Sequence, residues 1–362
     1  MTSWLEINSF ALMRNVRTVR DKIEDGVGLF AVVKANAYGH GLEIATEAFW
    51  RAGVDGFVVS EPNDALFLVE KGYRVPILLL HPPQANELWR LLEHKIRLAG
   101  TSPSTVADIA AAAVRHERRA YVHLELETGM HRSGVTIQEA REIISEAQSP
   151  KSPLVIEGLF THLCAADNPD ASRSQIEQVA NFLFELQQRD MHIPCTHILA
   201  SESVEAYPDA LFEAVRVGRA LYGAVAEIQT DLALTWKTRL CRIERIKRGD
   251  TVGYGKSYTA ERDMFVGTIP VGYSDGLDRS LGNTGFVLVR GKRCPIIGRV
   301  CMNDTMIDLS SVLYPELGDE VVLLGRQMAD RITPQEMAEW ANTIDYEILA
   351  RLSSSLSRIK VK

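Results

Sequence analysis

The chain has 362 residues, of which 46% are hydrophobic and 24% are charged. This composition is that of a globular protein and excludes a disordered chain, and the length allows two ordinary domains or one large barrel with an extension. The net charge of −7 excludes the basic surface that nucleic-acid binding needs. The sequence has no uncharged apolar run of membrane-spanning length and begins without the features of a signal peptide, so we expect no membrane association.

The cysteines indicate a reduced, cytoplasmic protein. None of the five belongs to a Cys-x-x-Cys pair, and an odd number of scattered thiols does not fit a disulfide framework. One group, His192, Cys195 and His197, is close enough in sequence to suggest a metal site. A fourth ligand with suitable spacing is missing, so we expect no bound metal.

Strands and helices are predicted to alternate through the first 230 residues. A short strand at 4–8 and a helix over 9–24 come first. Apolar runs then predict strands over 29–33, 56–60, 76–80, 96–99, 121–126, 156–160, 196–200 and 213–216, with helical patterns between most of them. Eight such strands predict an α/β fold of the (β/α)8 TIM-barrel type. A doubly wound sheet is the alternative, but no Gly-x-Gly-x-x-Gly motif follows the first strand.

The pattern changes at about residue 230, where short apolar runs and turns replace the alternation. These runs predict strands over 238–243, 250–255, 265–270, 286–290, 295–300 and 319–325, followed by a helix over 334–340 with Thr333 as its N-cap. We therefore predict a barrel domain over 1–229 and a mostly β domain over 230–362. Residues 1–9 are a candidate to pair with the second domain.

One lysine, Lys34, stands where the first barrel strand ends. A lysine there is most often a solvated side chain, but a desolvated one at the mouth of a barrel can act as a nucleophilic amine. Barrel enzymes carry their chemistry at the carboxyl ends of the strands, where this sequence also places Ser60, His81, Thr101, Arg132, Thr161, His162, Ser201 and Arg216. The loops after the last two strands usually bind phosphate, and here they contain Ser201 and the backbone of Gly218 and Arg219.

Eight motifs resemble those of one enzyme family. The segment AVVKANAYGHG at 31–41 is similar to the pyridoxal-phosphate lysine motif of bacterial alanine racemases, which are fold type III pyridoxal-phosphate enzymes. Further segments match in family order at 127–132, 161–162, 214–218, 222–223, 252–255, 272–276 and 298–302. The resemblance implies a homodimer with shared active sites, in which each chain has an N-terminal (β/α)8 barrel and a C-terminal β domain.

The resemblance also implies the catalytic residues. Lys34 would form a Schiff base with pyridoxal 5'-phosphate and then act as the base on one face of the substrate α-carbon. Tyr254 of the partner subunit would act on the opposite face, because racemisation needs one group to remove the proton and another to return it. Arg216 would face the pyridine nitrogen and connect through His162 to the tyrosine. Taken singly, these three would be a packing tyrosine, a surface cation and a half-buried histidine, but their joint order favours function.

Other residues would hold the cofactor and the substrate. Arg132 would bind the phenolic oxygen of the cofactor and the substrate carboxylate with its planar fork of donors, and the backbone N–H of Met302 would bind the same carboxylate. The phosphate would be held by Tyr38, Ser201, Gly218 and the N–H of Arg219. The substrate entryway would be lined by Tyr273, Asp167, Arg279 and Arg299.

The implied activity is the interconversion of L- and D-alanine, and the implied use of D-alanine is bacterial cell-wall synthesis. Two alternatives stay open at this point. One is a pyridoxal-phosphate amino-acid decarboxylase on the same type of barrel, although decarboxylation needs no second base such as Tyr254. The other is a pyridoxal-phosphate-binding protein without turnover, although such proteins lack a second domain.

Four positions depart from the family pattern. Many members carry a carbamate-modified lysine seven residues before the arginine, where this chain has Glu125, a carboxylate able to hold Arg132 without modification. Arg219 replaces a commonly aliphatic residue, and Asn303 replaces an aspartate. Ser354 falls where members carry a tyrosine that touches the phosphate and narrows the substrate pocket. We therefore hypothesise that the pocket accepts serine or a larger amino acid alongside, or instead of, alanine.

Overall fold

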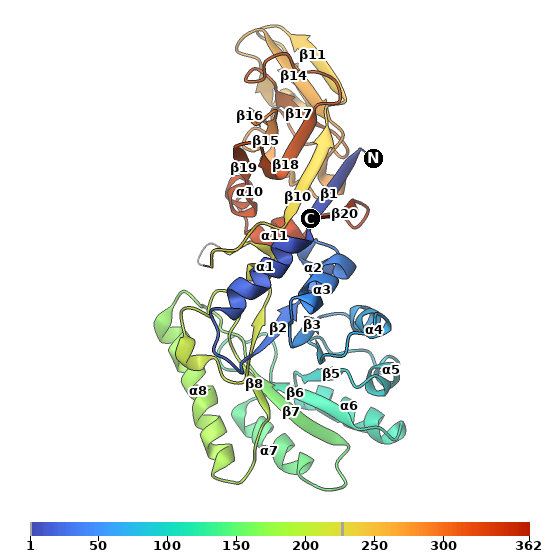
Figure 1. Cartoon of the computed structure of the whole chain (residues 1–362), viewed down its shortest axis with the longest axis vertical. Helices are drawn as coiled ribbons and strands as arrows, with labels where there is room; N and C mark the ends of the chain where they lie inside the picture. Colours follow the sequence, from blue (N-terminus) through green and yellow to red (C-terminus); the bar gives the residue numbers. More distant parts are fainter. Residues whose placement is uncertain (1, 226–227) are drawn as a thin grey trace.

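The computed structural model describes residues 2–225 and 228–362, which form two parts arranged end to end (Figure 1). The first part is a closed barrel of eight parallel strands, in which the last strand pairs with the first. The strands are β2 (Gly28–Val32), β3 (Gly56–Val59), β4 (Ile77–Leu79), β5 (Arg97–Gly100), β6 (Ala120–Glu125), β7 (Leu154–Phe160), β8 (Cys195–His197) and β9 (Ala214–Val217). This confirms the (β/α)8 prediction.

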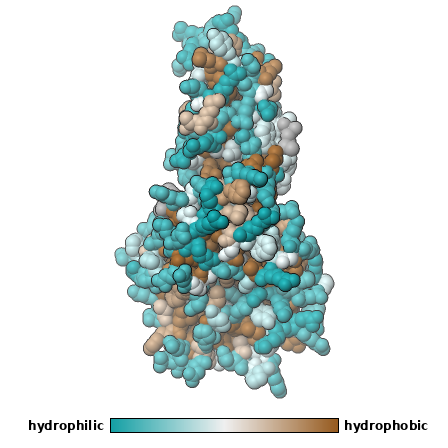
Figure 2. Space-filling model, viewed as in Figure 1, coloured by the Kyte–Doolittle hydropathy of each residue, from teal (hydrophilic) through white to brown (hydrophobic). Residues whose placement is uncertain are grey.

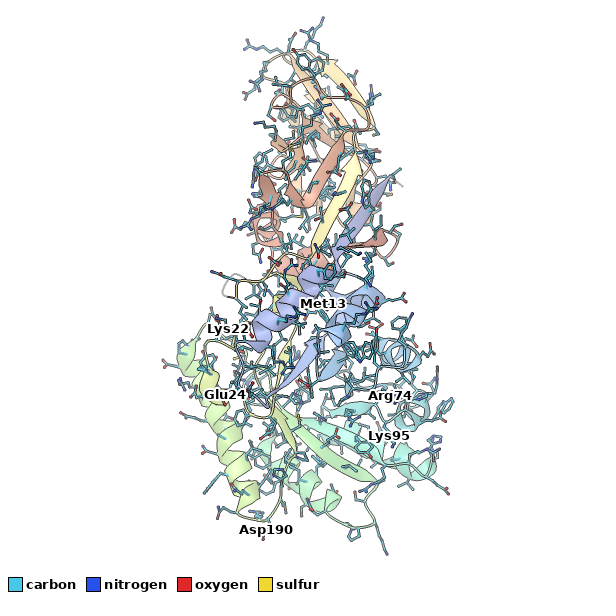
Figure 3. All side chains as sticks on the ribbon, viewed as in Figure 1. Met13, Lys22, Glu24, Arg74, Lys95 and Asp190 are labelled. Atoms are coloured by element: carbon cyan, nitrogen blue, oxygen red, sulfur yellow. The ribbon has the colours of Figure 1, made fainter. Side chains whose placement is uncertain are left out.

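Helices surround the barrel and cover the outer face of its strands. They are α1 (Ser9–Arg20), α3 (Leu42–Arg51), α4 (Pro62–Glu70), α5 (Leu88–Glu93), α6 (Pro103–Arg115), α7 (Ile137–Ala147) and α8 (Pro169–Gln187). Strands enclosed in this way are buried on both faces, which is why they read as continuous apolar runs. Figure 3 labels exposed charged side chains on the outer surface, among them Lys22, Glu24, Arg74, Lys95 and Asp190.

The second part is a mostly β domain that includes the first strand of the chain. Strand β1 (Ser3–Asn8) pairs antiparallel with β10 (Leu234–Arg239) and parallel with β20 (Ser357–Val361). The same sheet contains β15 (Phe286–Val289), β16 (Lys292–Pro295), β18 (Glu320–Gln327) and β19 (Asp330–Ile332). The other strands are β11 (Arg242–Ile246), β14 (Met264–Ile269) and β17 (Thr305–Asp308) in one sheet, and the pair β12 (Thr251–Val252) and β13 (Tyr258–Thr259).

Two helices complete the second domain. Helix α10 (Pro334–Ala341) begins at a capping box in which Thr333 and Glu336 bind each other's backbone N–H groups, as the sequence predicts for the N-cap. Helix α11 (Asp345–Ala350) lies where the second domain meets the barrel (Figure 1). It therefore stands close to the end of the barrel from which the Lys34 loop emerges.

Three predicted strands of the second domain differ from the structure. The predicted strand 238–243 is two strands, because the chain leaves one sheet after Arg239 and enters another at Arg242. Of the predicted strand 295–300, only Pro295 lies in a strand, as the last residue of β16. The chain bends after it, and Gly298 has a φ of 76°. The predicted strand 250–255 is reduced to β12 and continues as a short turn.

The outer surface is mixed in character. Figure 2 shows polar side chains over most of the visible face, with hydrophobic side chains exposed in several places on both parts. The exposed large hydrophobic residues include Tyr254, Tyr273 and Met302 of the second domain. Within residues 2–225 and 228–362, no helix has the length and apolar character needed to cross a membrane.

Candidate active site

A cavity of about 630 Å³ opens at the carboxyl ends of the barrel strands. Parallel strands of a barrel all end on one side, so residues far apart in sequence meet there. The cavity is lined by all of the predicted cofactor-binding residues, which are Lys34, Tyr38, Arg132, His162, Ser201, Arg216, Gly218 and Arg219. Glu125, Glu202 and Tyr346 also line it.

The backbone after Lys34 forms a left-handed turn rather than an ordinary loop. Residues 35–38 have φ values between 50° and 54°, a conformation that costs roughly 1–2 kcal/mol for each residue with a side chain. The turn is held at its end by the Asn36 side chain, whose Oδ1 accepts from the Leu42 N–H at 2.9 Å. Backbone strain of this kind concentrates at functional sites, and here it directly follows the candidate nucleophile.

The Lys34 amine lies among other positive groups. Burial lowers its pKa, and the charges of Arg132 and Arg216 lower it further. A lowered pKa increases the neutral fraction of the amine, which is the form that acts as a nucleophile or base.

Arg216 is buried and held firmly by the barrel. Its Nη1 lies 2.7 Å from Nδ1 of His197 and donates to the carbonyl of the same residue, while Nη2 donates to the Thr161 carbonyl at 2.7 Å. The guanidinium also lies 5.1 Å from the ring centre of Phe160. Burial lowers its pKa to about 10, so Arg216 is a fixed cation at neutral pH.

His162 lies in the same cavity but is not joined to Arg216. In the described part of the chain the hydrogen bonds of Arg216 go to Thr161, His197 and Ile198. Burial lowers the pKa of His162 to about 4, and Arg216 contributes to this shift. The histidine is therefore neutral near pH 7.

Glu125 is positioned as an anionic partner for Arg132. The Arg132 Nη2 lies 3.6 Å from the Glu125 carboxylate, which also accepts from the Ser133 hydroxyl at 2.7 Å. Glu125 is buried, whereas the Arg132 side chain is 57% exposed. A guanidinium anchored on one side keeps other donors free for a second carboxylate.

We use the term phosphate seat for the predicted phosphate-binding groups, which are Gly218, the backbone N–H of Arg219 and the hydroxyls of Ser201 and Tyr38. The N–H groups of Gly218 and Ala220 donate to the Ser201 hydroxyl oxygen at 3.1 and 3.3 Å, at the start of the short helix α9 (Arg219–Tyr222). The Ser201 hydroxyl is thereby fixed in place with its own proton free to donate. A Cβ on Gly218 would lie 2.6 Å from the Tyr38 hydroxyl, so only glycine allows this close approach. Backbone N–H and hydroxyl donors, with four cationic side chains lining the same cavity, fit an anionic phosphorylated cofactor.

The predicted second-domain residues lie outside this cavity. Tyr254 is 72% exposed and lines a separate hollow of about 660 Å³. Two backbone hydrogen bonds join the segments that carry Tyr273 and Met302. The Tyr273 N–H donates to the Cys301 carbonyl, and the Ser274 N–H donates to the Met302 carbonyl. Asn303, which departs from the family pattern, lies beside these two segments, since its side chain donates to the Ser274 hydroxyl at 2.8 Å.

The remaining predicted residues are exposed. Asp167 lines a hollow next to the cavity, and both are lined by His162. Arg279 and Arg299 lie on the second domain, where Arg299 approaches Gly255, the neighbour of Tyr254. Ser354 is exposed and does not line the cavity in its own chain.

A series of buried polar side chains beneath Arg216 was not predicted from the sequence. His197 Nε2 lies 2.7 Å from His123 Nδ1, and His123 Nε2 lies 3.4 Å from Glu157. Glu157 in turn pairs with Arg97 at 2.7 Å. The alternation of side chains along a strand offered a signal, because His123 is two residues from Glu125 and must face the same side.

Comparisons with known proteins point to one family. Residues 7–226 match the alanine racemase N-terminal domain, and residues 233–360 match the alanine racemase C-terminal domain. Alanine racemase 2 of Caldanaerobacter subterraneus subsp. tengcongensis is 33% identical over 365 residues, covering 99% of this chain and 94% of that protein. The alanine racemase of Symbiobacterium thermophilum is 35% identical, covering 98% of this chain and 96% of that protein.

Solved structures give the same result. The alanine racemase from D-cycloserine-producing Streptomyces lavendulae has a TM-score of 0.94 at 28% identity, covering 100% of this chain and 97% of its own. The alanine racemase from Bartonella henselae with covalently bound pyridoxal phosphate has a TM-score of 0.88 at 26% identity, covering 100% of both chains. On the match of both domains over nearly its whole length, the chain belongs to the alanine racemase family.

Proposed function

We propose that this protein is a pyridoxal-phosphate-dependent racemase that interconverts L- and D-alanine with two bases, Lys34 and Tyr254. The observation that carries the proposal is that Lys34, Arg132, Arg216 and the phosphate seat all line one cavity. Bound pyridoxal phosphate, linked to Lys34, supplies the electron sink that makes loss of the substrate α-proton feasible.

The residues of the cavity have distinct roles in this proposal. Lys34 holds or releases the α-proton at its Nζ on one face of the substrate, and its lowered pKa suits this exchange. Arg132, anchored by Glu125, orients the substrate carboxylate. Arg216 remains charged at neutral pH and would lie against the pyridine nitrogen of the cofactor, where a fixed cation would disfavour protonation of that nitrogen and so limit side reactions.

The second base comes from a partner subunit in this proposal. Tyr254 is 72% exposed in its own chain, and Tyr273 and Met302 beside the same surface are 44% and 56% exposed. Exposed aromatic and methionine side chains are typical of interface cores. We infer a homodimer in which the second domain of each chain completes the cavity of the other. The five free cysteines support a cytoplasmic location.

The two alternatives explain fewer of the features. A decarboxylase needs one proton donor at the α-carbon, which leaves the Tyr254 motif without a purpose. A binding protein without turnover has no need of the second domain, yet the family match extends over residues 233–360.

Incubation with L-alanine and L-serine in deuterated water tests the proposal. We expect D-isomers carrying α-deuterium, because the proton returned to the α-carbon comes from a base that exchanges with solvent. Release of CO2 instead would support the decarboxylase. Absence of any exchange would support the binding protein.

The substrate range is the finer part of the proposal. We hypothesise that Ser354, where the family pattern has a tyrosine, widens the pocket for serine or a larger amino acid. Small pockets discriminate by only about 1–3 kcal/mol per methylene, so one such change is enough to alter the ranking. Comparison of kcat/KM for alanine, serine and lysine decides: a strong preference for alanine that stays unchanged in Ser354→Tyr would contradict the idea.

A further inference from the structure

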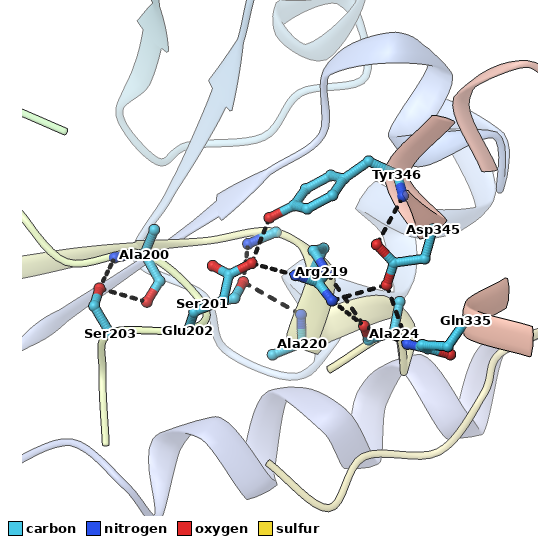
Figure 4. A network of polar contacts seen from close by, with 11 residues as sticks. Ala200, Ser201, Glu202, Ser203, Arg219, Ala220, Ala224, Gln335, Asp345 and Tyr346 are labelled. Atoms are coloured by element: carbon cyan, nitrogen blue, oxygen red, sulfur yellow. Dashed lines mark hydrogen bonds and ion pairs between the residues drawn. The ribbon is translucent and has the colours of Figure 1, made fainter. Parts of the chain in front are cut away.

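The side chain of Arg219 joins the barrel to the second domain. Its guanidinium pairs with Glu202, from the loop after β8, and its Nη2 lies 2.8 Å from Asp345 at the start of α11. Nε and Nη2 also donate to the Ala224 carbonyl at 3.2 and 2.9 Å. The side chain is only 16% exposed, and Figure 4 shows it at the centre of a network of polar contacts.

Second-domain residues enclose this guanidinium. Asp345 also accepts from Gln335 at 3.1 Å, and Gln335 donates to the same carbonyl that Arg219 binds. The Tyr346 ring lies 4.5 Å from the Arg219 guanidinium, and its hydroxyl donates to Glu202 at 2.5 Å. Any movement that separates the members of such a buried ionic network leaves a buried charge unpaired, which is costly. The network therefore holds its residues in place.

The same region of the second domain reaches the Lys34 loop. Gly39 ends the left-handed turn, and a Cβ placed on it would lie 2.3 Å from the carbonyl oxygen of Leu349 in α11. Helix α11 therefore contacts two of the segments that line the cavity, the loop after β2 and the start of α9.

The phosphate seat needs support from outside α9. This helix has four residues, which is too short for a helix to hold its shape alone. The Arg219 N–H of the seat belongs to the first turn of α9, and two N–H groups at this end hold the Ser201 hydroxyl, so any tilt of α9 moves these donors away from the bound anion. The Arg219 side chain is a direct link between this turn and α11.

We propose that Arg219, Glu202 and Asp345 are positioning residues that hold the phosphate seat by bracing α9 against α11. This deepens the proposed function and rests on it, since the seat is the place of the cofactor phosphate. The family resemblance gives Arg219 a role through its backbone N–H alone. Here its side chain pairs with two carboxylates, which neutralise its charge. Arg219 therefore affects the phosphate by holding α9 in position rather than by direct attraction.

A titration with two ligands tests the brace. The holoenzyme is stripped of cofactor with hydroxylamine and titrated back with pyridoxal phosphate, and separately with pyridoxal, which lacks the phosphate. We expect Asp345→Asn and Arg219→Leu to raise the Kd for pyridoxal phosphate at least about tenfold, while the Kd for pyridoxal changes less than about twofold. Asp231→Asn, which breaks the exposed pair of Asp231 with Arg14, is the matched control and should change neither.

The possible outcomes separate the two proposals. Equal weakening of both ligands would show a general structural role and overturn the brace, as would unchanged affinity for pyridoxal phosphate. If Arg219→Leu fails to fold by circular dichroism, Asp345→Asn and Glu202→Gln decide, because each removes a charge at nearly constant volume. A wild-type protein that binds no pyridoxal phosphate overturns the proposed function itself, whereas tight binding by wild type and variants alike overturns only the brace.

Discussion

The Nη1 of Arg216 lies 2.7 Å from Nδ1 of His197, with both side chains buried in the barrel. A guanidinium can only donate, so Nδ1 accepts and the neutral imidazole carries its proton on Nε2. That proton faces His123 Nδ1 at 2.7 Å, which assigns the His123 proton to Nε2, facing Glu157. Burial lowers the pKa of both histidines, in agreement with two neutral rings.

Replacement of His197 tests whether this chain fixes Arg216. We expect His197→Phe to lower the free energy of unfolding by roughly 1–3 kcal/mol, because it leaves a buried guanidinium N–H without its acceptor. His197→Asn, which keeps an acceptor, should lose less. Urea unfolding measures both, with the exposed His192→Phe as control. Equal stability of His197→Phe and wild type would contradict the assignment.

One buried histidine, His40, and one partly buried histidine, His162, predict a loss of stability in acid. Burial lowers the pKa of His40 and His162 to about 4, against 6.5 for the free side chain. The unfolded chain therefore binds protons that the folded chain does not, so the stability is fully present above pH 6.5 and falls as the pH drops towards 4.

Urea unfolding at two pH values measures this loss. Between pH 7 and pH 5 we expect each of these histidines to cost about 2 kcal/mol. His40→Gln should reduce the pH dependence, since it removes one of the titrating groups, whereas replacement of the exposed His116 should leave it unchanged. The same pH dependence in His40→Gln and wild type would rule His40 out as a source.

The barrel could be predicted from sequence because its signal is local. Each strand is a buried apolar run that is visible within a few residues, and the order of neighbours follows from the fold rule. The second domain gave a weaker signal. Strands β1 and β20 come from opposite ends of the chain and pair with each other, and the break between Arg239 and Arg242 marks a change of sheet. Residues 1–9 could be named as a candidate to pair with the second domain, but the partner strand β20 and the change of sheet could not be predicted, because non-local pairings are not specified by a single segment.

The site divides in the same way. Motif order and residue type were enough to name the residues that line the cavity with Lys34. The histidine chain below Arg216 and the brace around Arg219 were not predicted, because each depends on distances between elements that are far apart in sequence. The left-handed turn at 35–38 is local, but it was not predicted because none of its four residues is the glycine that usually signals a positive φ.

Gly218→Ala tests the close contact in the phosphate seat. An added Cβ would lie 2.6 Å from the Tyr38 hydroxyl, so the tyrosine or the start of α9 must move. Overpacking of this size costs about 1–3 kcal/mol, and we expect the Kd for pyridoxal phosphate to rise roughly tenfold. Titration of the stripped enzyme measures it. A binding curve equal to that of wild type would show that the seat lies elsewhere.

Glu125→Gln tests the anion beside Arg132. The variant keeps the shape of the side chain but removes the charge that lies 3.6 Å from the guanidinium. We expect KM for alanine to rise about threefold to tenfold, with a smaller change in kcat, because Arg132 is less firmly placed for the substrate carboxylate. Steady-state kinetics measures the split. A fall in KM would mean that Glu125 competes with the substrate for Arg132.

Mixing two inactive variants tests whether the site is shared. Lys34→Ala and Tyr254→Phe each remove one base, and Tyr254→Phe should keep the visible absorption of the cofactor bound to Lys34. If each cavity uses Lys34 of one chain and Tyr254 of the other, a mixed dimer has one site with both bases and one with neither. Random reassociation makes half of the dimers mixed, so about a quarter of wild-type activity should return. A site built within one chain predicts no recovery, because every chain then lacks one base.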